Sequence, residues 1–241
     1  VNDFHMGISN DLCAEKYGVS REDQDRYAAE SYRRSLAAIA GGRFEDEILP
    51  VTIPRRKGDP LVFGRDECPR ETPYDVLAGM RPAFQKAGTA TAGNASVISD
   101  GAAAVVVMAR EKAETLGCPI LAVAGAQASY GIDMKYVLVA PIWAVPKCLA
   151  KQGIAAEEVD LFEINEAFSG STLAVLRELR LDPAKVNVNG GAVSLGHPIG
   201  ASGCRVLVTL LSEMTRRGCR TGLASLCLGG GEAVAMVVRR P

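Results

Sequence analysis

The hydrophobic pattern of the second half of the chain switches between strand-like and helix-like spacing. Apolar runs of strand length cover residues 121–128, 159–164, 185–189, 221–228 and 232–239. Apolar side chains recur at helical spacing in segments between them, at residues 145–152, 166–179 and 202–217. Strands that alternate with helices predict a layered α/β sheet. The last two runs, which only three glycines separate, predict an antiparallel pair.

The first half of the chain begins with helical patterns and then becomes irregular. Helical spacing covers residues 8–18 and a second segment that ends near Ala40. Ser20 and Asp23 precede that second segment with the spacing of a capping box. Residues 55–92 are rich in proline, glycine, arginine and aspartate. A loop this long in a compact domain is either functional or a solvated surface excursion, and the sequence favours neither interpretation.

An apolar run and a short helix join the two halves. Residues 101–108 are rich in alanine and valine and predict a buried strand, which a helix over residues 110–116 follows. The composition supports a real core, because hydrophobic residues make up 48% of the chain and charged residues 23%. The length of 241 residues fits one large domain or two ordinary ones.

Charge and cysteine content exclude several classes of protein. The net charge of -1 provides no basic field for nucleic acid. No apolar run is long enough for a bilayer, and the first residues do not resemble a signal peptide. Seven cysteines without a C-x-x-C pair predict reduced thiols, and two histidines, His5 and His197, are too few for a His-based metal centre. We therefore expect a cytoplasmic protein without a membrane, nucleic-acid or metal partner.

Two segments of the last third carry polar or reactive residues at predicted strand ends, where α/β folds build their sites. Asn165 and Glu166 follow one strand and are interpreted either as site residues or as a helix cap and a dipole partner. His197 lies in a loop that holds five glycines within residues 190–203. A lone histidine is more often hydrogen-bonded in a core than catalytic. The glycines favour function, because they allow a substrate to approach the backbone closely.

Cys227 ends another predicted strand and precedes the glycines at 229–231. A cysteine in such a place is usually a small hydrophobic residue. Here the N–H groups of the glycines are free to form an oxyanion hole. Their proximity predicts a lowered pKa for the Cys227 thiol, which would then exchange protons at neutral pH.

Together these segments resemble the signature motifs of the thiolase family, which read N-E-A-F, G-G-x-x-x-x-G-H-P-x-G-x-S-G and C-x-G-G-G in this order. Upstream segments that contain His5, Phe84 and Ser96 are also similar, so the resemblance covers essentially the whole chain. It implies a thiolase-like layered α/β/α fold with a mixed five-stranded sheet. Residues 1–118 would be part of the thiolase loop region and the end of the N-terminal domain, and residues 119–241 the C-terminal domain.

The resemblance also implies roles for individual residues. His197 would activate a nucleophilic cysteine of the N-terminal domain and form an oxyanion hole with a water held by Asn165. Cys227 would be the acid/base that moves the α-proton of the second acyl-CoA. The N–H of Gly229 would lie in a second oxyanion hole.

Further residues correspond to substrate contacts in the family. Ser96 resembles a residue that contacts the pantetheine arm of coenzyme A. His5, Met6 and Phe168 resemble residues that line the acyl pocket, and Arg70 is expected at the nucleotide end of coenzyme A. The resemblance implies acyl-CoA thioesters as substrates, no permanently bound cofactor, and a homo-oligomer, either a dimer or a tetramer.

The implied reaction is thiolysis of 3-ketoacyl-CoA or Claisen condensation of acyl-CoA. The upstream cysteines lack the glycine- and serine-rich surroundings of the family's nucleophile: Cys13, Cys68, Cys118 and Cys148. We therefore expect this chain to supply only the His/Cys acid-base half of the site. A nucleophile domain is expected to precede Val1, and the isolated chain is predicted to be inactive.

Two alternatives and two departures accompany this prediction. A decarboxylating ketoacyl synthase is disfavoured, because such enzymes use a second His or Asn where this chain has Cys227. A non-enzymatic thiolase-like subunit or scaffold is favoured by the missing nucleophile and disfavoured by the retained motifs.

Glu232 and Trp143 stand where thiolases carry smaller or uncharged residues. Glu232 either alters substrate choice or points to solvent, and Trp143 is expected to reshape the acyl pocket.

Overall fold

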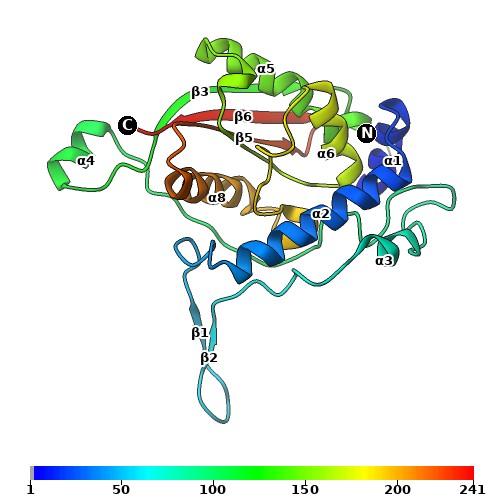
Figure 1. Ribbon diagram of the computed structural model, residues 1–241, viewed down its shortest axis with the longest axis horizontal. Helices are drawn as coiled ribbons and strands as arrows, with labels where there is room; N and C mark the ends of the chain where they lie inside the picture. Colours follow the sequence, from blue (N-terminus) through cyan, green and yellow to red (C-terminus); the bar gives the residue numbers. More distant parts are fainter. Residues whose placement is uncertain (1–2) are drawn as a thin grey trace.

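A mixed four-stranded sheet forms the centre of the computed structural model, which describes residues 3–241 (Figure 1). The strands lie in the order β3-β6-β5-β4. Strand β4 pairs in parallel with β5, and β6 pairs antiparallel with both β5 and β3. The strand bounds are β3 Val123–Gly131, β4 Leu161–Ile164, β5 Thr221–Leu228 and β6 Glu232–Arg239.

Helices cover both faces of this sheet and complete the layered α/β/α arrangement that the sequence predicts (Figure 1). Helices α5 (Pro141–Gln152) and α6 (Ser169–Glu178) pack on one face, where Phe162 and Ile164 of β4 point. Helix α8 (Ser202–Arg217) packs on the other face through Val206, Leu210 and Met214. Because successive side chains of β4 point to opposite faces, Phe162 and Ile164 belong to one hydrophobic cluster and Leu161 to the other.

The N-terminal half wraps around the α6 side of the sheet. Helix α1 (Met6–Lys16) packs on α6, and α2 (Arg21–Ala40) packs on both α6 and the short helix α7 (Ala192–Leu195). The capping box predicted for α2 is present, because Ser20 and Asp23 exchange side-chain and backbone hydrogen bonds. The contact with α7 brings α2 next to the loop that carries His197.

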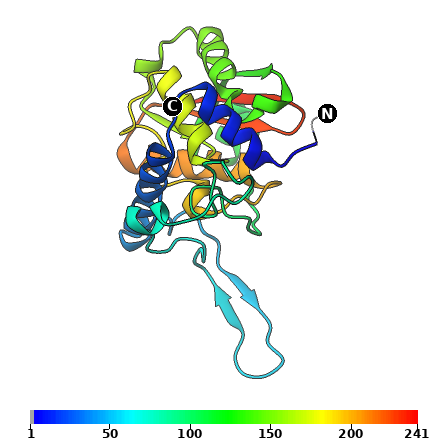
Figure 2. The ribbon, with the colours of Figure 1, turned by 90° about the vertical axis from the view of Figure 1, so that its right-hand side faces the viewer.

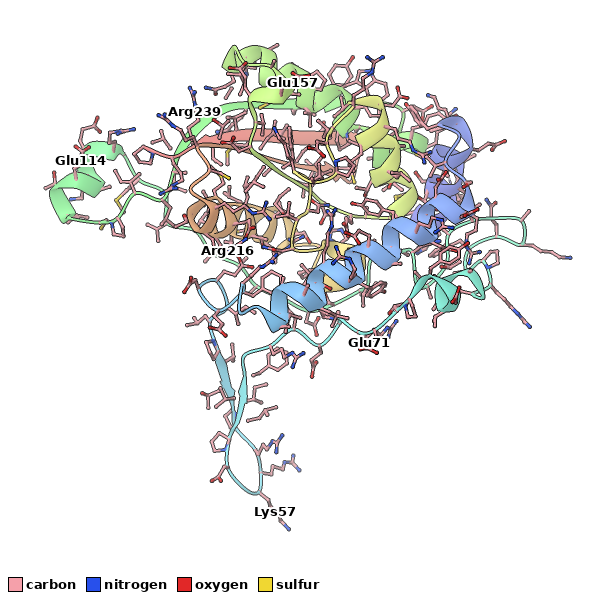
Figure 3. All side chains as sticks on the ribbon, in the orientation of Figure 1. Lys57, Glu71, Glu114, Glu157, Arg216 and Arg239 are labelled. Atoms are coloured by element: carbon pink, nitrogen blue, oxygen red, sulfur yellow. The ribbon has the colours of Figure 1, made fainter. Side chains whose placement is uncertain are left out.

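A two-stranded hairpin over residues 51–63, which includes the start of the irregular segment 55–92, extends away from the body. Strand β1 (Val51–Ile53) pairs antiparallel with β2 (Leu61–Phe63), and Figure 2 shows the pair projecting from the rest of the molecule. Lys57 lies at its tip, far from the sheet (Figure 3). The short helices and 3-10 turns of the remaining chain are α3 Tyr74–Ala78, α4 Arg110–Leu116, η1 Met134–Val139 and η2 Ala156–Glu158.

The predicted fifth strand is reduced to a single bridge. Residues 185–189 form an isolated parallel bridge between Val186 and Phe162 at the free edge of β4. The segment turns away because Asn187 adopts a positive φ of 46° and its side chain bonds the backbone of Ile164. Its position beside the sheet is as expected, but its backbone is not that of a strand.

The prediction of a buried strand over residues 101–108 is wrong for the described structure. This segment has no strand partner among residues 3–241, and its side chains are exposed, with Val106 at 86% and Val107 at 81%. It leads into α4, which stands apart from the sheet (Figure 1). An apolar run indicates a tendency to be buried but does not identify the surface that buries it.

None of the helices within residues 3–241 combines the length and apolarity needed to cross a lipid bilayer.

Candidate active site

A short extended segment joins two of the predicted motifs. The N–H of Ser96 donates to the carbonyl of Ala167 at 3.1 Å, and the N–H of Ser169 donates to the carbonyl of Asn94 at 2.9 Å. On its other side, the His197 N–H donates to the carbonyl of Val97 at 2.7 Å. Residues 94–98 thus lie between the N-E-A-F segment and the glycine-rich loop, and they place Ser96 close to both.

The imidazole of His197 is held in one orientation by Ser202 of α8. The Nδ1 atom lies 2.5 Å from the Ser202 hydroxyl, and that hydroxyl donates its proton to the carbonyl of Pro198 at 3.1 Å. We infer from this bonding pattern that the hydroxyl directs its one proton at Pro198 and accepts from an Nδ1–H group. Nε2 of the neutral ring therefore presents its lone pair, which is the form a general base requires.

The environment of His197 also disfavours its charged form. The side chain is half-buried, and burial lowers the pKa of the imidazole below its ordinary value. The positive charge of Arg205, which lies on α8 one turn after Ser202, also lowers this pKa. At neutral pH the ring is consequently an unprotonated base.

Asn165 carries an unsatisfied amide at the end of β4. Its backbone N–H donates to the carbonyl of Ser225 at 3.0 Å. Asn165 therefore lies beside Ser225 of β5, which is two residues before Cys227. The side chain is 6% exposed, and both its Oδ1 and Nδ2 atoms lack a protein partner among the described residues. Buried amides are rarely left without a hydrogen bond, so this pair of atoms fits a bound water or a substrate oxygen.

Cys227 lies near the end of β5, opposite Ala233 of β6. Its side chain is half-buried against the same cluster that contains Phe168 and Cys13. The prediction of a lowered pKa is wrong here, because burial raises the pKa of this thiol to about 11. At neutral pH the thiol retains its proton and is suited to donate it.

The glycines after Cys227 form the turn between β5 and β6. Gly230 and Gly231 have φ values of 101° and 93°, which a residue with a side chain adopts only with strain. Gly229 is exposed, and among the described residues its N–H donates no backbone hydrogen bond. This free donor, two residues from the thiol, suits an oxyanion contact.

Aromatic rings connect the expected acyl-pocket residues. The rings of His5 and Phe84 stack at 4.5 Å, and Phe84 meets Phe168 edge-on at 5.9 Å. Met6 packs against the same hydrophobic cluster as Cys227. In the sequence Phe84 is only part of a thiolase-like motif, but its position between His5 and Phe168 makes it a further site candidate.

Glu166, for which the sequence allows either a site role or a role as a helix dipole partner, makes four side-chain hydrogen bonds. Its buried carboxylate accepts from the Tyr27 hydroxyl at 2.9 Å, the Ser31 hydroxyl at 2.8 Å and the Val193 N–H at 3.1 Å. The Asn187 amide adds a fourth bond at 3.2 Å. Glu166 thereby ties α2 to the loop that carries His197, a link that no local sequence pattern signals.

Arg70 and Glu232 make no hydrogen bond or ion pair with this group among the described residues, whereas Trp143 packs against the same hydrophobic cluster as Met6 and Cys227. Arg70 lies beside Tyr32 of α2, where burial raises the tyrosine pKa and the Arg70 charge opposes the rise. The side chain of Glu232 is exposed at the start of β6. Trp143 stacks on Tyr130 with ring centroids 6.2 Å apart. Within residues 3–241 no group of three or more His, Cys, Asp or Glu side chains is arranged to hold a metal ion.

Comparisons with known proteins match the whole chain to one family. The family model described as Thiolase, N-terminal domain, matches residues 1–111. The model described as Thiolase, C-terminal domain, matches residues 118–240. An acetyl-CoA acetyltransferase of Pseudomonas aeruginosa is 55% identical over 240 residues, which are 99% of this chain and 61% of that protein.

Solved structures agree with these sequence matches. The crystal structure of the Bacillus anthracis acetyl-CoA acetyltransferase superposes with a TM-score of 0.97 at 44% identity, covering 99% of this chain and 61% of that one. Human mitochondrial 3-ketoacyl-CoA thiolase gives a TM-score of 0.93 at 38% identity over 97% of this chain and 59% of its own. The chain therefore spans about 61% of the length of the bacterial relatives it matches.

Proposed function

Because the chain belongs to the thiolase family, we propose that it supplies the acid/base half of a thiolase acyltransferase site. The proposed reaction is thiolysis of a 3-ketoacyl-CoA or, in reverse, Claisen condensation of two acyl-CoA thioesters. The observation that carries the proposal is the bonding of His197, whose Nδ1 is occupied by Ser202 and whose Nε2 is left as a base.

His197 would take the proton of a nucleophilic cysteine carried by the N-terminal thiolase domain. That cysteine then attacks the 3-keto carbon of the substrate, and the bond between the α- and β-carbons breaks. The imidazole Nε2–H and a water held by Asn165 would stabilise the negative charge on the thioester oxygen of the second acyl-CoA. The unpartnered amide of Asn165 supports this role.

Cys227 would complete the cleavage by donating its proton to the carbon of the departing enolate. The thiol of coenzyme A would then give its proton to Cys227 and attack the thioester on the nucleophile. Acyl-CoA would leave, and the released cysteine thiolate would take back its proton from His197. The Cys227 thiol suits the protonation of the enolate, since burial raises its pKa to about 11 and keeps the proton in place until carbanion character develops. The N–H of Gly229 would bond the oxygen of the tetrahedral intermediate on the nucleophile. In condensation, the same groups would act in reverse order.

We assign the coenzyme A thioester to the surface around residues 94–98. Ser96 would contact the pantetheine arm, and Arg70 the nucleotide end. His5, Met6 and Phe168 would line the acyl pocket, and their ring contacts with Phe84 support one continuous wall. No permanently bound cofactor is required by this chemistry.

The division of labour within the chain follows the same proposal. Residues 1–118 would belong to the loop region and the end of the N-terminal domain, and residues 119–241 to the C-terminal domain.

Cys13 is unsuited to be the nucleophile, because burial raises its pKa to about 12. The nucleophile would therefore come from the part of the family's length that this chain does not span. We expect a cytoplasmic homo-oligomer, a dimer or a tetramer, and an isolated chain without activity.

Thiolysis of acetoacetyl-CoA tests the half-site directly. The purified 241-residue chain is expected to show the same rate as its Cys227→Ala variant. When it is mixed with the part of the Pseudomonas aeruginosa relative that this chain does not match, activity is expected and should be lost in the Cys227→Ala and His197→Ala variants. Activity of the chain alone above that of Cys227→Ala would contradict the half-site. A mixture that binds but stays inactive would instead favour a non-enzymatic thiolase-like subunit.

A further inference from the structure

The hairpin formed by β1 and β2 has one apolar face, and that face is exposed. In the antiparallel register Val51 lies opposite Phe63, and Ile53 lies opposite Leu61. Directly opposite residues of an antiparallel pair point to the same face, so these four apolar side chains form one patch. The exposed fraction of each is substantial, from 36% for Phe63 to 55% for Val51.

This apolar patch favours a partner beyond the hairpin itself. An isolated two-stranded hairpin is at best marginally stable in water. Single exposed apolar residues are ordinary, but a contiguous exposed patch marks an interaction site. The hairpin projects from the rest of the molecule, so the body of its own chain does not lie over the patch (Figure 2).

The two ends of the hairpin carry opposite charge. The tip, residues 54–60, contains Arg55, Arg56 and Lys57 and a single aspartate. The base, where the hairpin joins the body, consists of residues 45–47, which read Glu-Asp-Glu, and residues 65–67, which read Arg-Asp-Glu. Asp46 and Glu67 of the base are exposed, and Lys57 lies at the far end of the hairpin (Figure 3). The hairpin is therefore cationic at its tip and acidic at its base.

A second copy of the hairpin matches both features when it runs in the opposite direction. A two-fold axis perpendicular to the strands places the same patch of both copies face to face. The same axis brings each cationic tip against the acidic base of the other copy. An axis along the strands would instead bring the two cationic tips together, and repulsion between like charges disfavours that arrangement.

Pairing through the edges of the strands is a less favourable way to join two hairpins. Pro50, Pro54 and Pro60 flank the two short strands. Proline has no N–H to donate and is one of the residues that keep edge strands from pairing with another chain. Contact through the apolar face is consequently the arrangement that the sequence of the hairpin supports.

We propose that the β1–β2 hairpin is a self-association surface whose partner is the hairpin of a second copy of this chain, running in the opposite direction. The inference goes beyond the proposed function, because it names one contact surface of the expected homo-oligomer and uses no step of the reaction. A standard interface has about 20 residues or more on each side, so a contact limited to the hairpin is weak and reversible.

An exchange of charge tests the opposed arrangement. In one variant Arg55→Glu and Arg56→Glu make the tip acidic. In a second variant Asp46→Lys and Glu67→Lys make the base cationic. In sedimentation equilibrium each variant alone should self-associate at least about tenfold more weakly than the wild type, because both contacts between tip and base become repulsive. An equimolar mixture should restore the dimer, because every tip then meets a base of opposite charge, and this recovery also shows that both variants are folded.

A second pair of variants tests the apolar patch. Ile53→Gln should weaken self-association, whereas Val62→Gln should not, since Val62 lies opposite Thr52 on the other face. A zero-length carbodiimide cross-link between Lys57 and Glu67 should join a nitrogen-15-labelled copy to an unlabelled one. Such a link cannot form within one copy, because the length of the hairpin separates tip and base by about 20 Å.

Three results would each overturn the proposal. The first is a wild-type chain that remains monomeric at about 1 mM. The second is self-association that neither the charge exchange nor Ile53→Gln changes, because another surface would then hold the copies together. The third is loss of the Lys57–Glu67 cross-link when the unmatched part of the Pseudomonas aeruginosa relative is added, which would assign the patch to that part. None of these measurements depends on catalysis, so they are independent of the acetoacetyl-CoA assay.

Discussion

The two histidines of the chain are held in opposite tautomers by their hydrogen bonds. Nδ1 of His5 accepts from the Gly7 N–H at 3.0 Å, so the proton of that ring is on Nε2. Nδ1 of His197 instead donates to Ser202, so its free nitrogen is Nε2. A single serine hydroxyl therefore decides which nitrogen of His197 faces a reaction partner.

Replacing this hydroxyl should change the tautomer of His197 without changing the fold. In Ser202→Ala the Nδ1–H group loses its acceptor, and the ring is expected to shift towards the Nε2–H form. Nitrogen-15 shifts of both rings at pH 8 measure the change, with His5 as the unchanged reference. A wild-type His197 already in the Nε2–H form would contradict this account, because the hydroxyl would then be the donor.

The thiol of Cys227 is a weaker acid in the folded chain than a free cysteine. Burial raises the pKa of its thiol to about 11, so alkylation by iodoacetamide in the folded chain should accelerate only as the pH approaches that value. Peptide-resolved mass spectrometry separates this cysteine from the other six. In urea the same residue should label with a midpoint near the ordinary value of about 8.5. A native midpoint at or below that value would show that the glycine N–H groups outweigh burial.

At the scale of elements, Glu166 is the residue that fastens the N-terminal helices to the site. Its carboxylate accepts from two hydroxyls of α2 and from the N–H of Val193 in α7. Glu166→Ala would leave these buried donors without an acceptor, so the free energy of unfolding in urea should fall by about 3 kcal/mol. Glu178→Ala, on the exposed end of α6, is the matched control and should change it by about 0.5 kcal/mol or less. Equal losses in the two variants would contradict the anchoring role.

Elements whose pattern is local were predictable from the sequence. The bounds of α8, β5 and β6 agree with the amphipathic and apolar runs, because each of these elements buries its own apolar face within this chain. The run at residues 101–108 was misjudged because no described element covers it. The motifs single out His197, Asn165 and Cys227 as candidates. They do not indicate the bonds of Glu166 to α2, which join residues 135 and 139 positions apart.

At the scale of the whole molecule, the base of the β1–β2 hairpin is fixed to α8 by a carboxyl group that resists ionisation. Glu47 accepts a hydrogen bond from the Thr209 hydroxyl at 3.1 Å. Burial raises its pKa from 4.5 to about 7. The folded chain thus binds this proton more tightly than the unfolded chain, so Glu47 makes the protein less stable as pH rises from about 4.5 through about 7.

Glu47→Gln removes this ionisation and should reveal its pH dependence. At pH 5 the variant and the wild type should unfold at similar temperatures, because the wild-type carboxyl is still protonated when folded. Above pH 8 the variant should be the more stable of the two, by at most about 3 kcal/mol if the full shift in pKa is expressed. Glu45→Gln, an exposed neighbour, is the control and should show no such trend. A difference between Glu47→Gln and wild type that is constant from pH 5 to pH 9 would mean that Glu47 is ionised when the hairpin is docked, and that the attraction of Arg205 outweighs the cost of burial.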